Sequence, residues 1–491
     1  MTVTPQVVSA VTACGAQMLC GMSSGFTSPA LPELRAELQL SVSQESLITA
    51  LMPLGSALGS PLAALVLDRV GRKAVFVALA VYYFTGWLLV TYAGSAETLM
   101  AGRAVQGVGC GGSFIVLPNY IGEVAEPHVR GTLSIFMQLG FCCGTLLEFV
   151  VGKYVSWRWL ALLSAAVAAV WLPCLAVITE SPLWLVMRRR PRAALDALQR
   201  LRAPQHDCKA ELAELEHFAR DVLRRRVRPR EALRPPYIGP ILIVAGLFFF
   251  QPASGNDALT YFTVDILDAA DSALEPHTAS ILASAMWIPA TLVAALLADR
   301  AGRRPLLMVS SGLTAACTAA LGAFFYLRDA GHDVSGYSWL PLAALITFNP
   351  AFAVGLGMVP WIIIGEMFAP EMRGWGASVG TTLTSLVTTL ITVSFTGLAG
   401  AITQAGVFWL YSAITVLGVF FTLFCVLETK GKTLEEITEH FKGPDRRRPS
   451  GPVATEKEAE VDRPSGQPAR HRHSLSLDNG APSGDTLCDK L

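Results

Sequence analysis

The chain has 491 residues, of which 52% are hydrophobic and only 15% are charged, and its formal net charge is zero. A soluble protein normally carries about 25% charged residues, so this composition excludes an ordinary soluble domain and favours a membrane protein. The zero net charge gives no argument for nucleic-acid binding. The sequence also has no nucleotide-binding loop, catalytic triad or zinc-ligand spacing, so we expect neither an enzyme nor a bound cofactor or metal.

Apolar runs long enough for the ~20 residues of a membrane-spanning helix recur along the chain. We predict twelve spans, at about 8–30, 44–66, 74–93, 98–121, 131–151, 157–178, 236–266, 277–298, 305–326, 339–364, 375–400 and 404–427. The fold class is therefore an all-α membrane protein. Its expected domains are a six-helix half (1–179), cytoplasmic linker helices (180–235), a second six-helix half (236–427) and a mostly disordered cytoplasmic tail (428–491).

The distribution of basic residues predicts the orientation. One set of loops is rich in arginine, and the opposite loops are poor in basic residues and partly acidic. The basic set therefore faces the cytoplasm, with both termini inside, in what we expect to be the cell membrane. Most of the ten cysteines lie in apolar runs, where we expect small hydrophobic side chains and no disulfide framework.

One charged six-residue motif occurs twice, as Asp-Arg-Val-Gly-Arg-Lys at 68–73 and Asp-Arg-Ala-Gly-Arg-Arg at 299–304. Each half also has a glutamate followed seven residues later by an arginine, a step of about two turns on one helix face. Two copies indicate two related halves that turn on the same side of the membrane. We predict that the charges form a cytoplasmic network that breaks when the protein changes its conformational state; the alternative is unpaired positive-inside charge. The network residues are Asp68, Arg69, Arg72, Glu123, Arg130, Glu180, Asp299, Arg300, Arg303, Glu366, Arg373 and Glu428.

Over residues 8–440 these motifs resemble the sugar porter family of the major facilitator superfamily. Gly102-Arg103 with Gly107 is similar to the family's Gly-Arg-x-x-x-Gly, and residues 180–185 and 428–436 are similar to its signatures after the sixth and twelfth spans. Residues 51–55 and 151–154 resemble the arthropod facilitated trehalose transporters and related glucose carriers. The resemblance implies two pseudo-symmetric six-helix halves that move a hexose or a disaccharide such as trehalose by alternating access.

Two spans of the second half look broken: the seventh at Gly255, and the tenth at Gly355, Gly357 and Pro360. Backbone groups freed by a break must face a cavity, where a solute site is expected. A polyol needs amide groups and an aromatic ring, which Gln138, Gln251 and Trp361 supply. The resemblance implies that these three contact the sugar and that Tyr261 helps to close the outer gate. Interhelical hydrogen bonds for the two glutamines, and plain packing for the tryptophan, remain as alternatives.

The pocket departs from the family pattern at several positions. Pro252, Asp257, Trp287, Thr384 and Ala353 stand where the resemblance implies polar sugar ligands or, for Ala353, an acidic residue. These departures predict a working carrier with an altered substrate. The expected substrate-binding residues are Gln138, Gln251, Asn256, Asp257, Tyr261, Trp361 and Thr384.

Asp257 is a carboxylate within a span and therefore a candidate for function. The alternatives are a bound proton, a cationic group on the solute, or an ion pair with Arg103; Glu148 is expected to be solvated. Sugar porters that couple to protons tend to carry an acidic residue in the first span, and residues 25–29 have none. We expect facilitated diffusion, with a proton-coupled or non-sugar carrier that uses Asp257 as the alternative. A transporter-like nutrient sensor is the third hypothesis.

The predicted tail carries two serines that follow basic residues, Ser450 and Ser474. Each resembles a site for a basophilic kinase, and a phosphate there would create a docking site for a phospho-reader. The expected partners are thus a small solute, the lipid bilayer and a tail kinase or reader, with no nucleic acid.

Overall fold

The structure is a computed structural model that describes residues 5–224, 238–271, 274–368, 370–432 and 434–441. The side chains of residues 127, 221–224, 298–299, 370–371, 373, 434–435 and 438–439 lie outside the described residues. Over this part of the chain the secondary structure is helical, as the sequence predicts.

The described residues contain helices for all twelve predicted spans, which confirms the predicted fold class. Ten described helical segments are long and apolar enough to cross a membrane. One of them belongs to α21 (Pro370–Cys425), which contains two spans because its backbone is non-helical at Ile402 and Thr403. The 29-residue helix α6 (Ala96–Val124) supplies the remaining span.

The first six spans occupy residues 5–177. The first span consists of three helices in series, and the sixth ends in a short 3-10 turn. The elements are α1 (Pro5–Ala13), α2 (Gly15–Gly25), α3 (Thr27–Leu38), α4 (Val42–Val70), α5 (Arg72–Thr91), α6, α7 (Pro127–Gly152), α8 (Trp157–Cys174) and η1 (Leu175–Val177).

Spans seven to twelve begin at residue 238, and the seventh, eighth and tenth are interrupted. The elements are α13 (Ile238–Ala253), α14 (Asn256–Tyr261), α15 (Thr263–Ala269), α16 (Pro276–Ala285), α17 (Trp287–Ala301), α18 (Arg303–Asp329), η2 (Ser335–Tyr337), α19 (Leu340–Phe352), the π-helix η3 (Ala353–Gly357), α20 (Val359–Met367) and α21. We refer to residues 5–179 as the N-half and 238–427 as the C-half; their division into domains stays a prediction.

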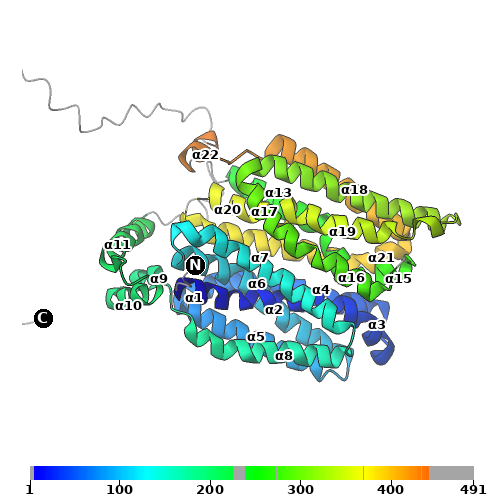
Figure 1. Cartoon of the computed structure of the whole chain (residues 1–491), viewed down its shortest axis with the longest axis horizontal. Coiled ribbons are helices and arrows are strands. Elements are labelled where there is room, and N and C mark those ends of the chain that lie inside the picture. The colour runs from blue at the N-terminus through cyan, green and yellow to red at the C-terminus, as the bar shows by residue number, and fades with distance from the viewer. Residues whose placement is uncertain (1–4, 225–237, 272–273, 369, 433, 442–491) are drawn as a thin grey trace, which may run out of the picture. The chain divides into compact units, whose positions relative to one another are not determined.

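Four short helices lie at one end of the bundle: α9 (Pro182–Met187), α10 (Pro191–Leu201), α11 (Cys208–Arg224) and α22 (Leu434–Phe441) (Figure 1). The two Asp-Arg-x-Gly-Arg loops open α5 and α18 beside them, so we call this the inner end. Helices α3 and α15 lie at the opposite, outer end (Figure 1). The predicted tail beyond Phe441, including Ser450 and Ser474, falls outside the described residues.

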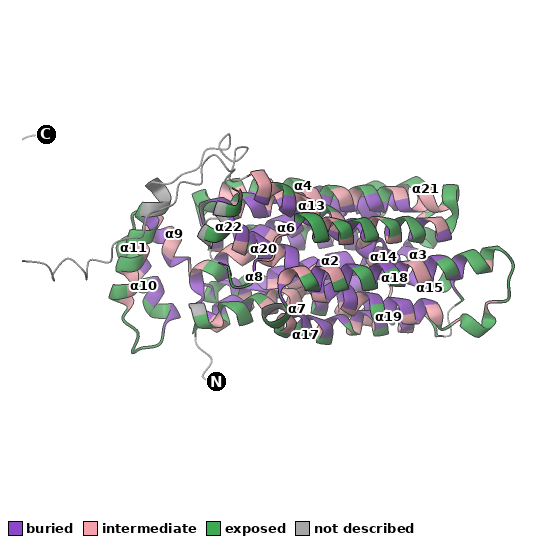
Figure 2. Cartoon of the chain, turned by 90° about the horizontal axis from the view of Figure 1, so that it is seen from above, coloured by how far each residue is buried: buried purple, intermediate pink, exposed green. Residues whose placement is uncertain are grey.

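Lipid-facing surfaces follow from the exposure of large apolar side chains. On α4, Leu58, Leu62 and Leu65 are 50–68% exposed at three- and four-residue spacing, which is one helix face. Figure 2 shows exposed residues along the outside of the bundle and buried ones within it. The interior face of α4 packs instead on α6 and, across the two halves, on α21.

The expectation that the cysteines act only as small apolar side chains is wrong for one pair. Cys20 of α2 and Cys110 of α6 are both buried and form a disulfide, with their Cα atoms 5.1 Å apart. Spacing along the sequence could not indicate this pairing, because 90 residues separate the two. The bond ties the first span to the fourth within the N-half.

Candidate functional site

The first Asp-Arg-x-Gly-Arg loop is a tight turn closed by a glutamate. Gly71 joins α4 to α5 with φ of 96°, a conformation that glycine adopts most readily. The Glu180 carboxylate accepts hydrogen bonds from the backbone N–H groups of Arg72 (2.9 Å) and Lys73 (3.2 Å). These groups open α5 and have no partner within the helix, so the carboxylate caps its positive end. A Cβ at Gly71 would lie 2.5 Å from the carboxylate, so the cap also requires glycine.

The C-half repeats this arrangement with different residues. Gly302 has φ of 88°, and the Glu428 carboxylate accepts from the backbone N–H groups of Arg303, Arg304 and Lys430, each at 3.0 Å. Burial of the carboxyl opposes its ionisation. The backbone N–H groups outweigh this effect and hold the pKa of Glu428 below its usual range. The glutamate after the sixth span and the glutamate after the twelfth therefore have the same structural role.

An ion pair accompanies each capped turn. Arg72 Nη2 lies 2.7 Å from Glu123 Oε1 in the N-half, and Arg303 Nη2 lies 2.7 Å from Glu366 Oε1 in the C-half. The hydroxyl of Thr429 also donates to Glu366, at 2.5 Å. Each pair joins the start of one helix to the end of another in the same half. That these residues form a network that breaks between conformational states stays a prediction. The ion pairs seen here each join two helices of the same half and do not cross between the halves.

The interpretation that each glutamate and its arginine seven residues later share one helix face is wrong. Helix α6 ends at Val124 and α7 begins at Pro127, so a turn separates Glu123 from Arg130. Glu123 pairs with Arg72 instead, while the Arg130 guanidinium donates to the carbonyl of Ala125 at 3.4 Å.

The remaining predicted network residues at the inner end contribute mainly through backbone atoms. The carbonyls of Asp68, Arg69 and Arg300 accept hydrogen bonds from Trp184 Nε1 (2.9 Å), Arg188 Nη2 and Lys430 Nζ (2.6 Å), respectively. The side chain of Asp68 is 69% exposed and lies 3.4 Å from Arg72. The side chains of Asp299 and Arg373 fall outside the described residues.

Two ion pairs join the halves at the outer end. Arg35 of α3 lies 2.6 Å from Glu45 of its own half and 3.3 Å from Asp265 of α15 in the other half. Lys153, which follows α7, lies 2.7 Å from Glu275, which precedes α16. The Lys153 ammonium holds the pKa of the Glu275 carboxyl below its usual range. Charged groups therefore close the outer end of the bundle.

Hydrogen bonds reinforce this outer contact. The backbone N–H of Val264 donates to Ser28 Oγ (3.1 Å), and the hydroxyls of Ser46 and Thr396 lie 3.1 Å apart. Among the described residues, the ion pairs that cross between the halves all lie at this end. The structure is thus closed at the outer end.

The tenth span is broken near its middle by the π-helix η3, where Gly355 and Gly357 lie as predicted and Pro360 follows in α20. A π-helix disturbs the regular backbone hydrogen bonds, so side chains must satisfy the freed groups. Ser310 of α18 donates to the carbonyl of Ala351 (2.6 Å) and accepts from the N–H of Leu356 (3.0 Å).

Gln251 binds the same break from the seventh span. Its Nε2 donates to the carbonyls of Leu356 (3.0 Å) and Gly357 (3.2 Å). The interhelical bond that the sequence left as an alternative is therefore present, and the hydrogen bonds given for the described residues do not involve the side-chain oxygen of Gln251. The seventh span itself breaks after α13, where Gly255 has φ of 90° and leads into α14.

Trp361 lies at the contact between the halves. Its ring stacks on Phe114 of α6 with centroids 5.5 Å apart and 12° between planes, and meets the edge of Phe248 at 4.9 Å. The Thr384 hydroxyl donates to the carbonyl of Phe248 (3.0 Å). Gln251 lies one turn beyond Phe248 on α13. The Gln251 amide on α13, the Trp361 indole on α20 and the Thr384 hydroxyl on α21 are therefore all close to Phe248.

Gln138 and Tyr261 take other positions. Gln138 Nε2 donates to Cys142 Sγ (3.7 Å) on its own helix, and Cys142 lies 3.8 Å from the hydroxyl of Thr291. The hydroxyl of Tyr261 is buried and donates to Met52 Sδ (3.2 Å) across the two halves. Tyr261 thus belongs to the outer closure, and the described contacts of Gln138 do not include the residues around Trp361.

The Asp257 carboxylate is held by neutral donors. The hydroxyl of Thr388 donates to its Oδ2, and Asn256 Nδ2 donates to its Oδ1 at 3.2 Å. It forms no ion pair with Arg103 within the described part of the chain. The guanidinium of Arg103 donates instead to the carbonyl of Ser23 (2.7 Å). It also donates to Gln106 Oε1 of α6 (2.9 Å) and to Thr27 Oγ1 of α3 (2.8 Å).

Sequence reasoning missed Glu148. The expectation that it is solvated is wrong, because the side chain is 0% exposed and its Oε1 accepts from Ser164 Oγ of α8 at 2.6 Å. Its position near the outer end of an apolar span suggested exposure. The burial becomes visible only from the packing of α8 over α7. The sequence did carry one indication: no basic residue lies three or four positions from Glu148, so an ion pair on the same helix could not explain the charge.

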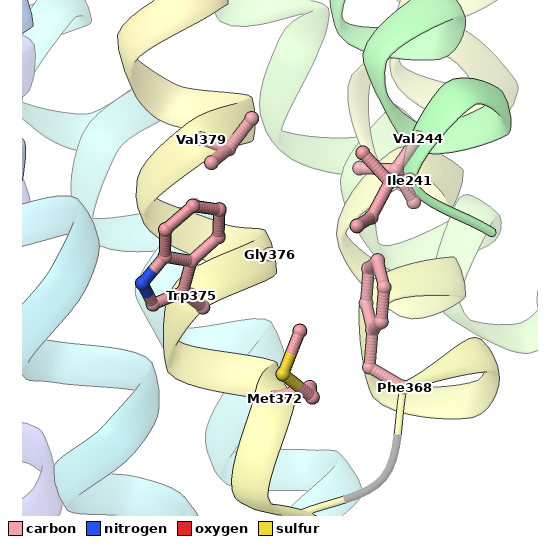
Figure 3. Close-up of a pocket in the computed structure, with 7 residues that line it drawn as sticks. All are labelled: Ile241, Val244, Phe368, Met372, Trp375, Gly376 and Val379. Carbon is pink, nitrogen blue, oxygen red and sulfur yellow. The ribbon is translucent and has the colours of Figure 1, made fainter. Parts of the chain in front are cut away.

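A hollow at the inner end of the C-half does not suit a sugar. Figure 3 shows its lining, from α13, from Phe368 after α20 and from the start of α21. All the labelled side chains are apolar apart from the indole nitrogen of Trp375. A polyol would lose hydrogen bonds to water there without replacement.

Comparison with known proteins places these features in a family. A family model described as "Sugar (and other) transporter" matches residues 8–441. The facilitated trehalose transporters of Polypedilum vanderplanki and Apis mellifera ligustica are 34% and 32% identical, over 90% and 91% of this chain and 89% and 90% of theirs. That of Aedes aegypti is 35% identical, and there the chain spans 56% of the relative's length.

Solved structures show the same fold. The inward open conformation of the xylose transporter from E. coli matches with a TM-score of 0.75 at 22% identity, covering 88% of this chain and 98% of that one. A proton:xylose symporter of the major facilitator superfamily matches with a TM-score of 0.75 at 22% identity, over 89% and 99%. The chain therefore has the major facilitator fold.

The glutamate caps generate a stability prediction. Glu180→Gln and Glu428→Gln should each lower the free energy of unfolding by about 1 kcal/mol, because an amide replaces a charge at a helix N-terminus. Thermal unfolding in detergent measures this, with Glu214→Gln on the exposed face of α11 as the control. Since the folded-state pKa of Glu428 is lowered, its contribution is present at neutral pH and is lost as pH falls through that pKa. A Glu428→Gln deficit that persists unchanged at acidic pH would contradict the cap.

The outer ion pairs generate a conformational prediction. Lys153→Glu should shift the carrier toward states open at the outer end, since it places two carboxylates together. The double variant Lys153→Glu with Glu275→Lys restores the pair and should restore the balance. Labelling of a cysteine introduced near Ser28 reports the opening. Equal labelling in all three proteins, at low and high salt, would show that the pair does not hold the outer end closed.

Proposed function

Because the chain belongs to the Sugar (and other) transporter family, we propose that it moves a small sugar across the membrane by alternating access. We propose hexoses and disaccharides such as trehalose as the solutes; the cited relatives are named as facilitated trehalose transporters. The observation that carries the proposal is the junction around Phe248. There an amide (Gln251), a hydroxyl (Thr384) and an indole (Trp361) converge beside the break of the tenth span.

The junction matches what a sugar requires. The oxygen of Gln251 is available to a sugar hydroxyl, because its nitrogen is already bound to two backbone carbonyls. The indole of Trp361 offers an apolar face to the C–H side of a sugar ring. That face is now covered by Phe114 of the other half. A sugar that replaces Phe114 therefore acts on the contact between the halves, which couples binding to their movement.

The polar contacts at the two ends give the carrier its mechanism. At the outer end the contacts join the halves, whereas the inner ion pairs join helices within each half. The halves can rock about the central junction while each inner cluster stays whole. We assign residues 1–179 and 236–427 to the moving halves, 180–235 to the linker helices, and 428–491 to the tail.

The orientation of this carrier follows from charge. The inner end carries the arginine-rich loops, so we assign it and both termini to the cytoplasm, with the carrier in the cell membrane. The movement is facilitated diffusion. The serines at 450 and 474 are assigned to a tail kinase and a phospho-reader, which would regulate the carrier.

A second candidate function rests on Asp257. Among the described residues its carboxylate has hydrogen-bond donors but no cationic partner. A cationic group on a non-sugar solute, or a transported proton, would supply the missing charge. In that case Asp257→Asn abolishes uptake, and glucose and trehalose do not compete with the true solute. A nutrient sensor without transport is separated from both by the absence of flux.

Uptake into proteoliposomes tests the proposal. Labelled glucose or trehalose should enter saturably without an imposed pH gradient. Gln251→Ala and Trp361→Ala should each lower uptake about tenfold, the effect of losing roughly 1.4 kcal/mol of binding. The matched controls are Gln199→Ala on α10 and Trp159→Ala on the exposed surface of α8, which should keep normal uptake. Normal uptake by Gln251→Ala and Trp361→Ala would place the solute elsewhere.

A further inference from the structure

Glu148 and Arg103 form a buried pair of charged groups in the N-half that sugar binding does not use. Both side chains are 0% exposed. Their mutual attraction is electrostatic across a gap, since they are not within ion-pair distance. A buried guanidinium needs a nearby negative charge, and Glu148 is the carboxylate that supplies it.

The hydrogen bonds around Glu148 suit both forms of a carboxyl group. Ser164 Oγ lies 2.6 Å from Glu148 Oε1 and 3.0 Å from the carbonyl of Leu160. A hydroxyl has one proton and donates to one acceptor at a time. When Glu148 is ionised, Ser164 donates to it. When Glu148 is protonated, its O–H donates to Ser164, which turns its own proton to Leu160.

Two opposing influences act on this carboxyl. Its second oxygen, Oε2, is buried and has no hydrogen-bond partner among the described residues, which favours the neutral acid. The charge of Arg103 favours the carboxylate. The other charged or titratable side chains described on α7 and on the elements packed on it lie toward its ends or are thiols: Cys14, Glu33, Arg35, Glu37, Glu97, Tyr120, Glu123, His128, Arg130, Cys142, Cys143, Arg158, Cys174, His277 and Arg300. The hydroxyl of Tyr261 of α14 also interacts electrostatically with Arg103.

Arg103 connects this carboxyl to the outer closure. Its guanidinium donates to Ser23 O (2.7 Å) and Thr27 Oγ1 (2.8 Å), which lie on either side of the joint between α2 and α3. The next residue, Ser28, accepts the N–H of Val264 from the C-half. The charge on Glu148 thus acts on the segment of the first span where the outer end closes.

We propose that Glu148 binds a proton when the outer end opens and releases it when the outer end closes. In the closed state an ionised Glu148 balances Arg103 in a site without water. Protonation removes that balance and leaves an uncompensated buried cation, so it favours the state in which water reaches Arg103. By linkage, opening takes up a proton to the same extent that protonation promotes opening. This inference rests on the alternating-access mechanism proposed above, but it does not depend on the sugar.

A small cavity lies close to Glu148, although the carboxyl itself does not line it, and we assign the proton's route to this cavity. It lies between α7 and the C-half and has a polar lining in Thr145, Thr260, Thr263 and Asn349. Thr145 lies three residues before Glu148, on the same face of α7. Separation of the halves widens this space, and water then reaches the carboxyl from the outer side.

Infrared spectroscopy of the reconstituted carrier tests the proposal without a need for transport. The C=O stretching band of a buried protonated carboxyl should titrate across roughly pH 5 to 9, a window that covers ordinary and burial-shifted groups. Glu148→Gln should remove this band, and Glu148→Asp should retain a titrating band. Asp257→Asn should leave it in place. A band that is absent, or that is lost in Asp257→Asn but not in Glu148→Gln, would overturn the proposal.

A second measurement follows the coupling to the gate. Labelling of a cysteine near Ser28 should increase severalfold as pH falls in the wild type. Glu148→Gln, which mimics the protonated form, should label at the high level at every pH, and Trp159→Ala on the exposed surface of α8 should keep the pH dependence. A pH profile that Glu148→Gln leaves unchanged contradicts the inference. A titrating Glu148 in a protein that moves no sugar would instead overturn the proposed function alone.

Discussion

The carboxylate cap on a glycine turn is the constraint on which both halves depend. Two membrane helices must be joined at the inner end by a turn too short to hold its own polar groups. The first N–H groups of α5 and α18 would lack partners there. Glu180 and Glu428 supply them, and glycine at 71 and 302 allows both the backbone conformation and the close approach of the carboxylate. The glutamates come from the segments that follow each half, so the caps tie those segments to their own half.

The contacts within each half differ from the contacts between the two halves. The inner ion pairs, the caps and the packing of α4 on α6 keep each half together. The contacts between the halves include partly exposed ion pairs and single hydrogen bonds at the outer end, a ring stack near the centre, and the packing of α4 on α21. Exposed ion pairs are individually weak. The polar contacts that close the outer end are therefore individually weak, at the place that alternating access must open.

Much of this was predictable from the sequence, because length, hydropathy and repetition are local signals. The twelve spans, the breaks at Gly255 and in the tenth span, and the charged turns follow from such signals. The partners of those residues do not. Glu123 meets Arg72 because a turn redirects the chain after Val124, and Glu148 is buried because α8 covers it. Cys20 meets Cys110 for the same reason, since tertiary packing brings together residues 90 positions apart.

The links within the first span make the two halves mechanically unequal. Span one is fastened to span four by the Cys20–Cys110 disulfide and by the hydrogen bonds of Arg103 on either side of its joint. The equivalent span of the C-half has a break at Gly255, and the tenth span contains a π-helix whose groups are held by single side chains. While both halves rock, we therefore expect local bending at the breaks of the C-half and little bending between the first and fourth spans of the N-half.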